Sequence, residues 1–273
     1  MISIFVTNSH LTYRSMYDDN YDFSSIRKIW HSDLLKPNIA EIETLIQANP
    51  LLHETLLLQG TALAIVDIST FQYLGIWGDL ENLLGWSKDD YFDGGIAFYL
   101  STFLPADQQG FVLISKYITD YVGTISQSEL QQMRMLYDYK LTHKDGHQVR
   151  IIQENITLKA DAEGRIIYSL ALVSDISHLN KEGTQHFCFL NGAEKRLYVI
   201  DNETNQCTQL DMLSKREVQI AQLLSQNLTS EQIAEQLFIS VHTVNTHRQK
   251  MIRKMGMTDT TDLLNFLKVY RLI

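Results

Sequence analysis

The last part of the chain has the spacing of apolar residues that is typical of short helices. From Leu213 onward, apolar side chains recur every three or four positions, which predicts helices that each bury one face. Ser214 and Glu217 have the spacing of a capping box, and Asn227 lies where the first helix is expected to end. Three more helices are expected from Thr229 or Ser230 to Leu237, from Ser240 to near Gly256, and from about Asp259 to Val269.

The third of these helices has two different faces when it is drawn at about 100° per residue. Val244, Met251 and Met255 fall on one side, with His247 beside them, and we expect this stripe to be buried. The opposite face carries no acid and no large apolar residue. Such a face suits the major groove of DNA. The residues of this opposite face are His242, Thr246, Gln249 and Arg253, flanked by Thr243, Asn245 and Lys250.

The middle of the chain has strand spacing instead. Two apolar runs begin at Leu63 and Tyr73, helical spacing follows to Thr119, and three strands are expected after it. Lys144-Asp145-Gly146 predicts a hairpin turn between the first two of these strands. The order β-β-α-α-α-β-β-β predicts an α+β domain, an antiparallel sheet with helices on one side.

Charge is divided unevenly along the chain. The whole sequence has a net charge of -9, but residues 213–273 hold eight basic and five acidic residues, or +3, which leaves -12 for residues 1–212. Binding to a polyanion depends on the local field, so the acidic average does not exclude DNA. Two cysteines, no long apolar run and no basic leader fit a reduced cytoplasmic protein without a membrane span.

The middle segment resembles a PAS domain. The resemblance lies in the stretch from Tyr137 to Arg150, in the strand that returns after it, and in the closing Asp175-Ile176-Ser177. It implies a sensor or dimerisation module. The cofactor stays unknown: no cysteine lies where a photoactive flavin needs one, and no histidine occurs from Tyr91 to Leu141 to bind haem. Aromatic residues that either wall a pocket or simply form core are Tyr91, Phe92, Phe98, Tyr99 and Phe103.

The C-terminal segment resembles the LuxR/GerE helix-turn-helix family, without a gap from Leu213 to Gly256 and on to the end. The resemblance implies base contacts from Asn245, Thr246 and Gln249. It implies phosphate contacts from Thr229, Ser230 and Thr243, charge contacts from Lys250 and Arg253, and a fourth helix that forms the dimer contact on DNA; His242 completes the set of expected DNA-binding residues. Many members have Lys where Asn245 stands.

The rest of the chain is assigned by pattern alone. We expect four regions: an N-terminal helical cap or extension (1–56), the PAS-like sensor (57–180), an ordered β-hairpin connector (181–212) and the helix-turn-helix domain (213–273). Met1 to Thr7 lacks the acidic pair that a receiver domain needs after its first strand. His186, Cys188 and Cys207 lack zinc spacing, so we expect no metal site.

These features indicate a sequence-specific transcription regulator that binds double-stranded DNA as a homodimer. No phosphate loop, nucleophile elbow or metal motif supports an enzyme, so we expect no catalytic residues. A small-molecule ligand in the PAS-like domain remains open. The alternatives are a constitutive dimer, in which that domain only dimerises, and an acyl-lactone receptor.

Overall fold

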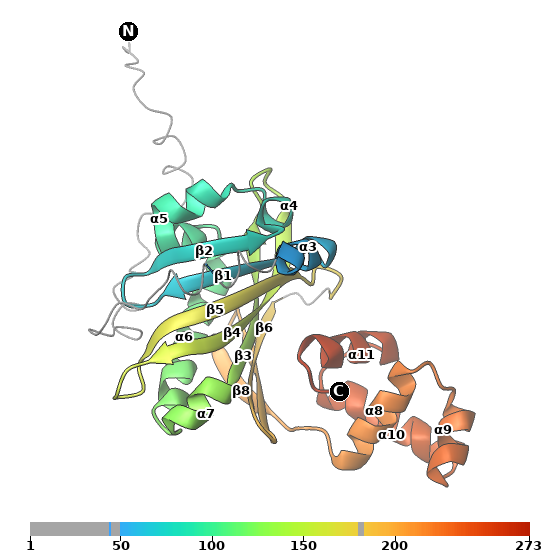
Figure 1. Cartoon of the computed structure of the whole chain (residues 1–273). Helices are drawn as coiled ribbons and strands as arrows, with labels where there is room; N and C mark the ends of the chain where they lie inside the picture. Colours follow the sequence, from blue (N-terminus) through green and yellow to red (C-terminus); the bar gives the residue numbers. More distant parts are fainter. Residues whose placement is uncertain (1–43, 45–49, 180–182) are drawn as a thin grey trace, which may run out of the picture.

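The computed structural model describes residue 44 and residues 50–179 and 183–273 (Figure 1). The expected strand from Met1 to Thr7 and much of the N-terminal extension lie outside these residues. The first part of the described chain has the elements α3 (Pro50–Leu58), β1 (Thr61–Asp67), β2 (Gln72–Gly78), α4 (Leu80–Leu84), α5 (Lys88–Ser101), α6 (Pro105–Val122) and α7 (Gln127–Gln132). It continues with β3 (Arg134–Thr142), β4 (Gln148–Ala160), β5 (Ile166–Asp175), β6 (Thr184–Asn191), β7 (Glu194–Asp201) and β8 (Gln206–Leu210).

All eight described strands form one antiparallel sheet in the order β2-β1-β5-β4-β3-β6-β7-β8. The first five are the strands that the pattern predicts for the PAS-like domain, and the α+β fold class is confirmed. The hairpin turn at Lys144-Asp145-Gly146 joins β3 to β4, as expected. The tip of this hairpin packs on the end of α4, where Gly85 takes a left-handed conformation and the Lys144 N–H donates to the Leu84 carbonyl (3.2 Å).

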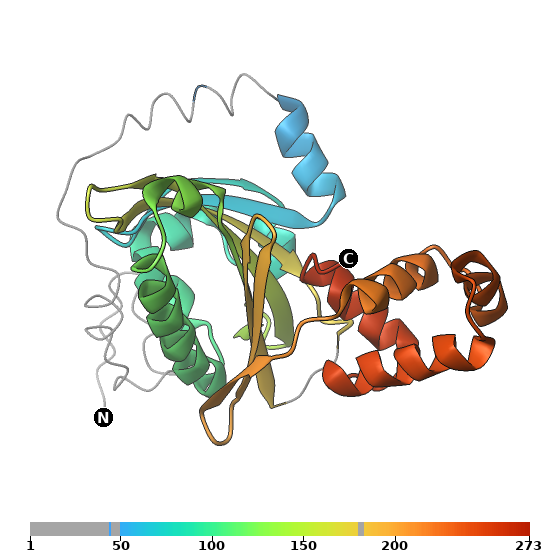
Figure 2. The same ribbon diagram turned by 90° about the horizontal axis from the view of Figure 1, so that it is seen from below.

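One face of the sheet is covered by α4 to α7 and holds the larger core (Figure 2). Helix α6 packs along it through aromatic pairs. Tyr117 lies 5.4 Å from Phe187, and Tyr121 stacks 4.5 Å from Phe189, measured between ring centroids. We call this the inner face. Because successive side chains on a strand point to opposite sides, the other residues of the same strands face outward.

The helices α4 to α7 of the PAS-like domain lie on one side of the sheet, as expected, and the outer face is covered by other parts of the chain. Leu56 of α3 packs with Leu63 and Ile65 of β1 at one end of the sheet. At the other end, the C-terminal helices share an apolar cluster with β3, β4 and β6 (Figure 2). The sheet has apolar side chains on both faces here, and each set requires a cover.

The segment from 183 to 210 continues the sheet instead of standing apart from it. The strands expected around Asn191-Gly192 are β6 and β7, and β6 pairs with β3. The polar edge strand β8 was not expected. Cys188 and Cys207, on β6 and β8, are free thiols. The division of the chain into four regions stays a prediction.

The C-terminal domain has the four expected helices: α8 (Lys215–Ser225), α9 (Ser230–Leu237), α10 (Val241–Lys254) and α11 (Thr260–Val269). Ser214 and Glu217 form the expected capping box, and Asn227 has the left-handed conformation expected after α8. Within the described residues, no helix is long and apolar enough to cross a bilayer.

A buried ion pair joins the strands on the outer face. The Arg150 guanidinium donates to the Asp138 carboxylate (2.9 Å from Nε), and the His186 N–H donates to the same carboxylate (2.7 Å). We predict that Asp138→Ala lowers the free energy of unfolding by about 3–5 kcal/mol, because it removes the carboxylate that balances the charge of a buried guanidinium. Urea unfolding followed by circular dichroism measures this. The control Glu163→Ala removes an exposed pair with Arg165 and should cost under about 1 kcal/mol; equal losses would contradict the prediction.

Candidate nucleic-acid interface and ligand cavity

Helices α9 and α10 form a helix-turn-helix because both begin at side-chain caps. The Thr229 hydroxyl accepts the Gln232 N–H at the start of α9, and the Ser240 hydroxyl accepts the Thr243 N–H at the start of α10. Between the helices, Phe238 takes a left-handed conformation (φ 52°) and is 95% exposed. The connection between the two helices is therefore short, with Phe238, Ile239 and Ser240 between Leu237 and Val241.

Helix α10 buries the stripe that its sequence predicts. Val244, Met251 and Met255 are buried, and His247 beside them is half-buried. The opposite face is open to solvent and carries most of the expected DNA-binding residues. Those of α10 that are exposed are His242, Asn245, Thr246, Gln249, Lys250 and Arg253, while Thr243 is half-buried.

The hydroxyl groups expected at phosphates have partners within the domain. Thr229 caps α9, and the Thr243 hydroxyl is hydrogen-bonded to that of Ser240 (2.8 Å). The Ser230 hydroxyl donates to the Asn245 side-chain oxygen (2.9 Å). This bond orients the Asn245 side chain on the exposed face of α10.

Arg248 was not among the expected site residues, although it fixes three of the helices. Its guanidinium donates to the Ser230 hydroxyl and to the Thr260 hydroxyl at the start of α11, both at 2.9 Å. The Arg248 guanidinium also donates to the Asn245 side-chain oxygen, at 3.4 Å. Arg248 thus holds the starts of α9 and α11 against α10. The sequence offered one indication of this role, since the helical spacing places Arg248 between the buried and the open face of α10.

An acid from another helix lies against the cationic end of α10. Glu217 of α8 is 1% exposed, 3.4 Å from Lys254 Nζ and 3.8 Å from Lys250 Nζ. Burial opposes ionisation, but hydrogen bonds from Ser214 and the charge of Lys254 lower the pKa of Glu217 below its ordinary value. Lys254 also donates to the Met212 carbonyl (2.7 Å), so it stabilises the fold. Lys250 and Arg253 are the exposed cations beside the open face of α10.

The inner face of the PAS-like domain encloses a cavity. It holds about 820 Å³ of empty space, part of it open to solvent, between β1, β4 and β5 of the sheet and the covering helices. Among the described residues that line it, none is charged. Tyr91 and Tyr99 of α5 contribute to its wall. Phe98 and Phe103 pack in the core, whereas Phe92 is 39% exposed and does neither.

One wall of the cavity carries a network of neutral polar groups. The Gln153 amide donates to the Tyr137 hydroxyl (2.8 Å) and to the Asn155 oxygen (2.9 Å), and the Asn155 amide donates to Tyr137 (2.7 Å). Tyr139 also donates to the Gln153 oxygen. The Tyr91 hydroxyl is buried at the cavity and has no hydrogen-bond partner among the described residues. Burial raises the pKa of both Tyr91 and Tyr137, so they stay neutral donors. An orphaned donor is costly unless a ligand or water bonds to it.

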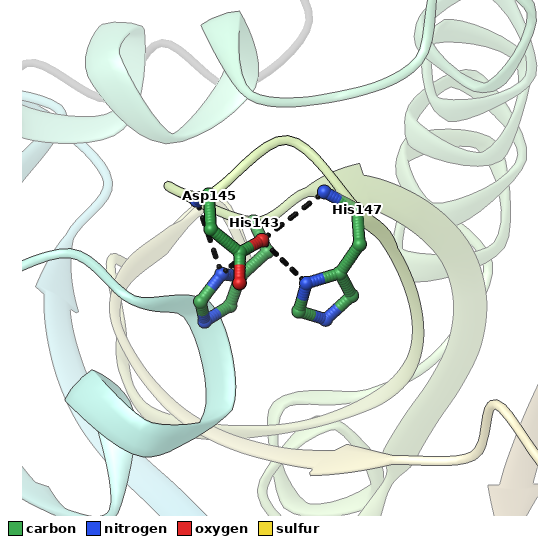
Figure 3. Close-up of side chains that lie close together, drawn as sticks. All are labelled: His143, Asp145 and His147. Carbon is green, nitrogen blue, oxygen red and sulfur yellow. Dashed lines mark hydrogen bonds and ion pairs between the residues drawn. The ribbon is translucent and has the colours of Figure 1, made fainter.

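His143, Asp145 and His147 form a cluster at the β3–β4 hairpin (Figure 3). Their ligand-type atoms lie within 4.8 Å of one another. The turn itself accounts for this geometry. The His147 N–H and ring both bond the Asp145 carboxylate, which lowers its pKa to about 2, and the His143 ring accepts the Asp145 N–H (3.3 Å). His186, Cys188 and Cys207 do not form such a group, and the absence of a metal site stays a prediction.

Comparison with known proteins identifies the C-terminal part. Residues 211–267 match the family model of the bacterial regulatory proteins, luxR family. The C-terminal domain is a LuxR-family helix-turn-helix domain. The match covers α8, α9, α10 and most of α11, the elements that form the open face just described.

Curated relatives resemble the chain through this LuxR-family domain. The positive transcription regulator BvgA of Bordetella pertussis is 32% identical over 68 residues, which are 25% of this chain and 32% of BvgA. The Fimbriae Z protein of Escherichia coli K12 is 35% identical over 78 residues, 28% of this chain and 37% of that protein. The chain therefore spans about a third of the length of the curated relatives it matches.

Solved structures cover more of the chain at low similarity. A structure titled "VqmA bound to DPO" is 15% identical, covers 80% of this chain and 89% of its own, and has a TM-score of 0.31. A PAS domain from Colwellia psychrerythraea is 15% identical, covers 49% of this chain and 98% of its own, and has a TM-score of 0.36. Scores of this size carry no argument about fold or function.

Asn245 offers a test of the LuxR-type interface. We predict that Asn245→Lys steepens the dependence of log K on log salt by about one unit, because one more phosphate charge is neutralised. Fluorescence anisotropy with a duplex, measured over a range of potassium chloride concentrations, gives the slope. Gln148→Lys adds the same charge at the exposed β3–β4 hairpin and should leave the slope unchanged. An unchanged slope for Asn245→Lys would place this residue away from the phosphates.

Proposed function

We propose that this protein is a transcription regulator that binds a specific DNA sequence and responds to a small neutral molecule. One observation carries the proposal: a LuxR-family domain with an acid-free, exposed face on α10 stands in the same chain as a cavity with an uncharged lining and a polar wall. The first feature suits DNA and the second a ligand.

The proposed DNA contacts follow the placement of the side chains. Asn245, Thr246 and Gln249 meet base edges in the major groove, with His242 on the same face of α10. Thr229, Ser230 and Thr243 meet phosphates, and Lys250 and Arg253 add charge. All are exposed or half-buried, which supports the proposal. We infer that two copies bind half-sites about one helical turn apart, as helix-turn-helix dimers do, in the bacterial cytoplasm where the DNA is.

The cavity favours sensing over the constitutive-dimer alternative, in which a dry and tightly packed interior is expected. Its lining is mostly apolar with a few polar groups placed together, which is the composition of small-molecule sites. A charged ligand would find no counter-ion among the lining residues, so the ligand class is neutral and polar at one end. An acyl-lactone is one member of that class and remains an alternative. We assign no catalytic role to any residue.

Mass spectrometry tests the sensor. We predict that native spectra of freshly purified protein show a bound small molecule, which is lost on denaturation and absent from Ala171→Phe, because the new ring fills the cavity. Ala162→Phe is the matched control, since Ala162 is exposed in the turn before β5. A wild-type dimer without any bound molecule would favour the constitutive-dimer alternative. A monomer without any bound molecule would mean that DNA drives assembly.

A further inference from the structure

The C-terminal helix α11 and the residues after it lie on the outer face of β3, β4 and β6 (Figure 2). Phe266 and Tyr270 are each 1% exposed. The His186 ring of β6 packs edge-on against Phe266, with 5.0 Å between ring centroids, and Tyr270 donates to the His186 carbonyl (3.4 Å). Leu136 and Cys188 belong to the same apolar cluster as the core of the LuxR-family domain. The DNA-binding domain is therefore docked on the sensor sheet.

Arg271 fastens this docked position. Its guanidinium donates twice to one oxygen of the Glu154 carboxylate, at 2.9 and 2.5 Å, and its carbonyl accepts from Lys195 of β7 (2.9 Å). Arg134 donates to the other Glu154 oxygen (2.8 Å). Arg271 also has φ 53°, a conformation that L residues rarely adopt and that tertiary contacts must hold.

One contact of this docked position is open to solvent. The Arg271 side chain is 54% exposed, so water and salt weaken its pair with Glu154. Interfaces between domains of one chain commonly resemble transient protein interfaces. Only four residues, 211–214, connect β8 to α8, and the Lys254 bond to Met212 ties this connection to the LuxR-family domain.

Strands β3 and β4 contact the DNA-binding domain on their outer face and line the cavity on their inner face. Glu154 lies between Gln153 and Asn155, which both belong to the polar wall of the cavity. Leu136, in the docking cluster, precedes Tyr137, which belongs to that wall. Residues that contact the cavity and residues that contact the DNA-binding domain are therefore direct neighbours on β3 and β4.

We propose that the outer face of β3, β4 and β6 is a releasable docking surface for α11, and that cavity occupancy changes the strength of this docking. The proposal rests on the sensing function proposed above. It requires that the occupied and empty cavities hold β4 differently, since a ligand shifts an equilibrium only by its differential affinity for the two states.

The docking surface is tested by hydrogen exchange in the full-length chain. Arg271→Met and Glu154→Gln should each speed exchange of the α11 amides about five-fold, as expected for loss of one partly exposed ion pair. The double variant should do little more than either single one. Arg165→Met is the matched control, because it removes a pair with Asp161 of similar exposure (42% and 3%) far from α11. Unchanged α11 exchange in both single variants would overturn the docking surface.

The coupling is tested by filling the cavity without any ligand. Ala171→Phe, or Ala171→Leu if the larger ring prevents folding, should change α11 exchange at least about two-fold, whereas Ala162→Phe should not. A change confined to the sheet and to α4–α7 would overturn the coupling and leave the docking surface intact. If native spectra show no ligand but the Ala171 variant still alters α11, the proposed sensing fails while the coupling stands.

Discussion

A β-strand sends successive side chains to opposite faces, and this constraint joins the two halves of the molecule. On β4, Gln153 and Asn155 face the cavity while Glu154 faces the DNA-binding domain. The inner face therefore has polar groups that a neutral ligand can meet, and the outer face has a carboxylate that a partly exposed arginine can reach. A sheet with apolar side chains on both faces must be covered twice. Here α4 to α7 cover one face, and α3 and the LuxR-family domain cover the other.

The DNA-binding face depends on a second constraint, the caps of short helices. Thr229 and Ser240 fix where α9 and α10 begin, and Arg248 holds both to the start of α11. Under the proposed function, the Ser230–Asn245 bond holds the Asn245 side chain in place before DNA binds, and a base that bonds Asn245 well is favoured over one that does not.

The sequence predicted the features that depend on residues only a few positions apart. The buried stripe of Val244, Met251 and Met255 and the left-handed Asn227 follow from spacing and capping alone, and the resemblance to the LuxR family is confirmed for the C-terminal domain. The polar strand β8 has no apolar alternation that would reveal it. The pairing of β6 with β3 and the Arg271–Glu154 pair, 117 positions apart, depend on tertiary packing that no window of sequence contains.

We propose above that α10 of the LuxR-family domain contacts DNA through its open face. Hydroxyl-radical footprinting of the full-length chain, with and without a selected duplex, tests this claim at the side chains themselves. We expect duplex DNA to protect His242, Gln249 and Arg253, while the exposed Leu58 and Phe92 of the N-terminal half keep their reactivity. DNA that binds yet leaves those three side chains of α10 as reactive as before would contradict a role of α10 in DNA binding.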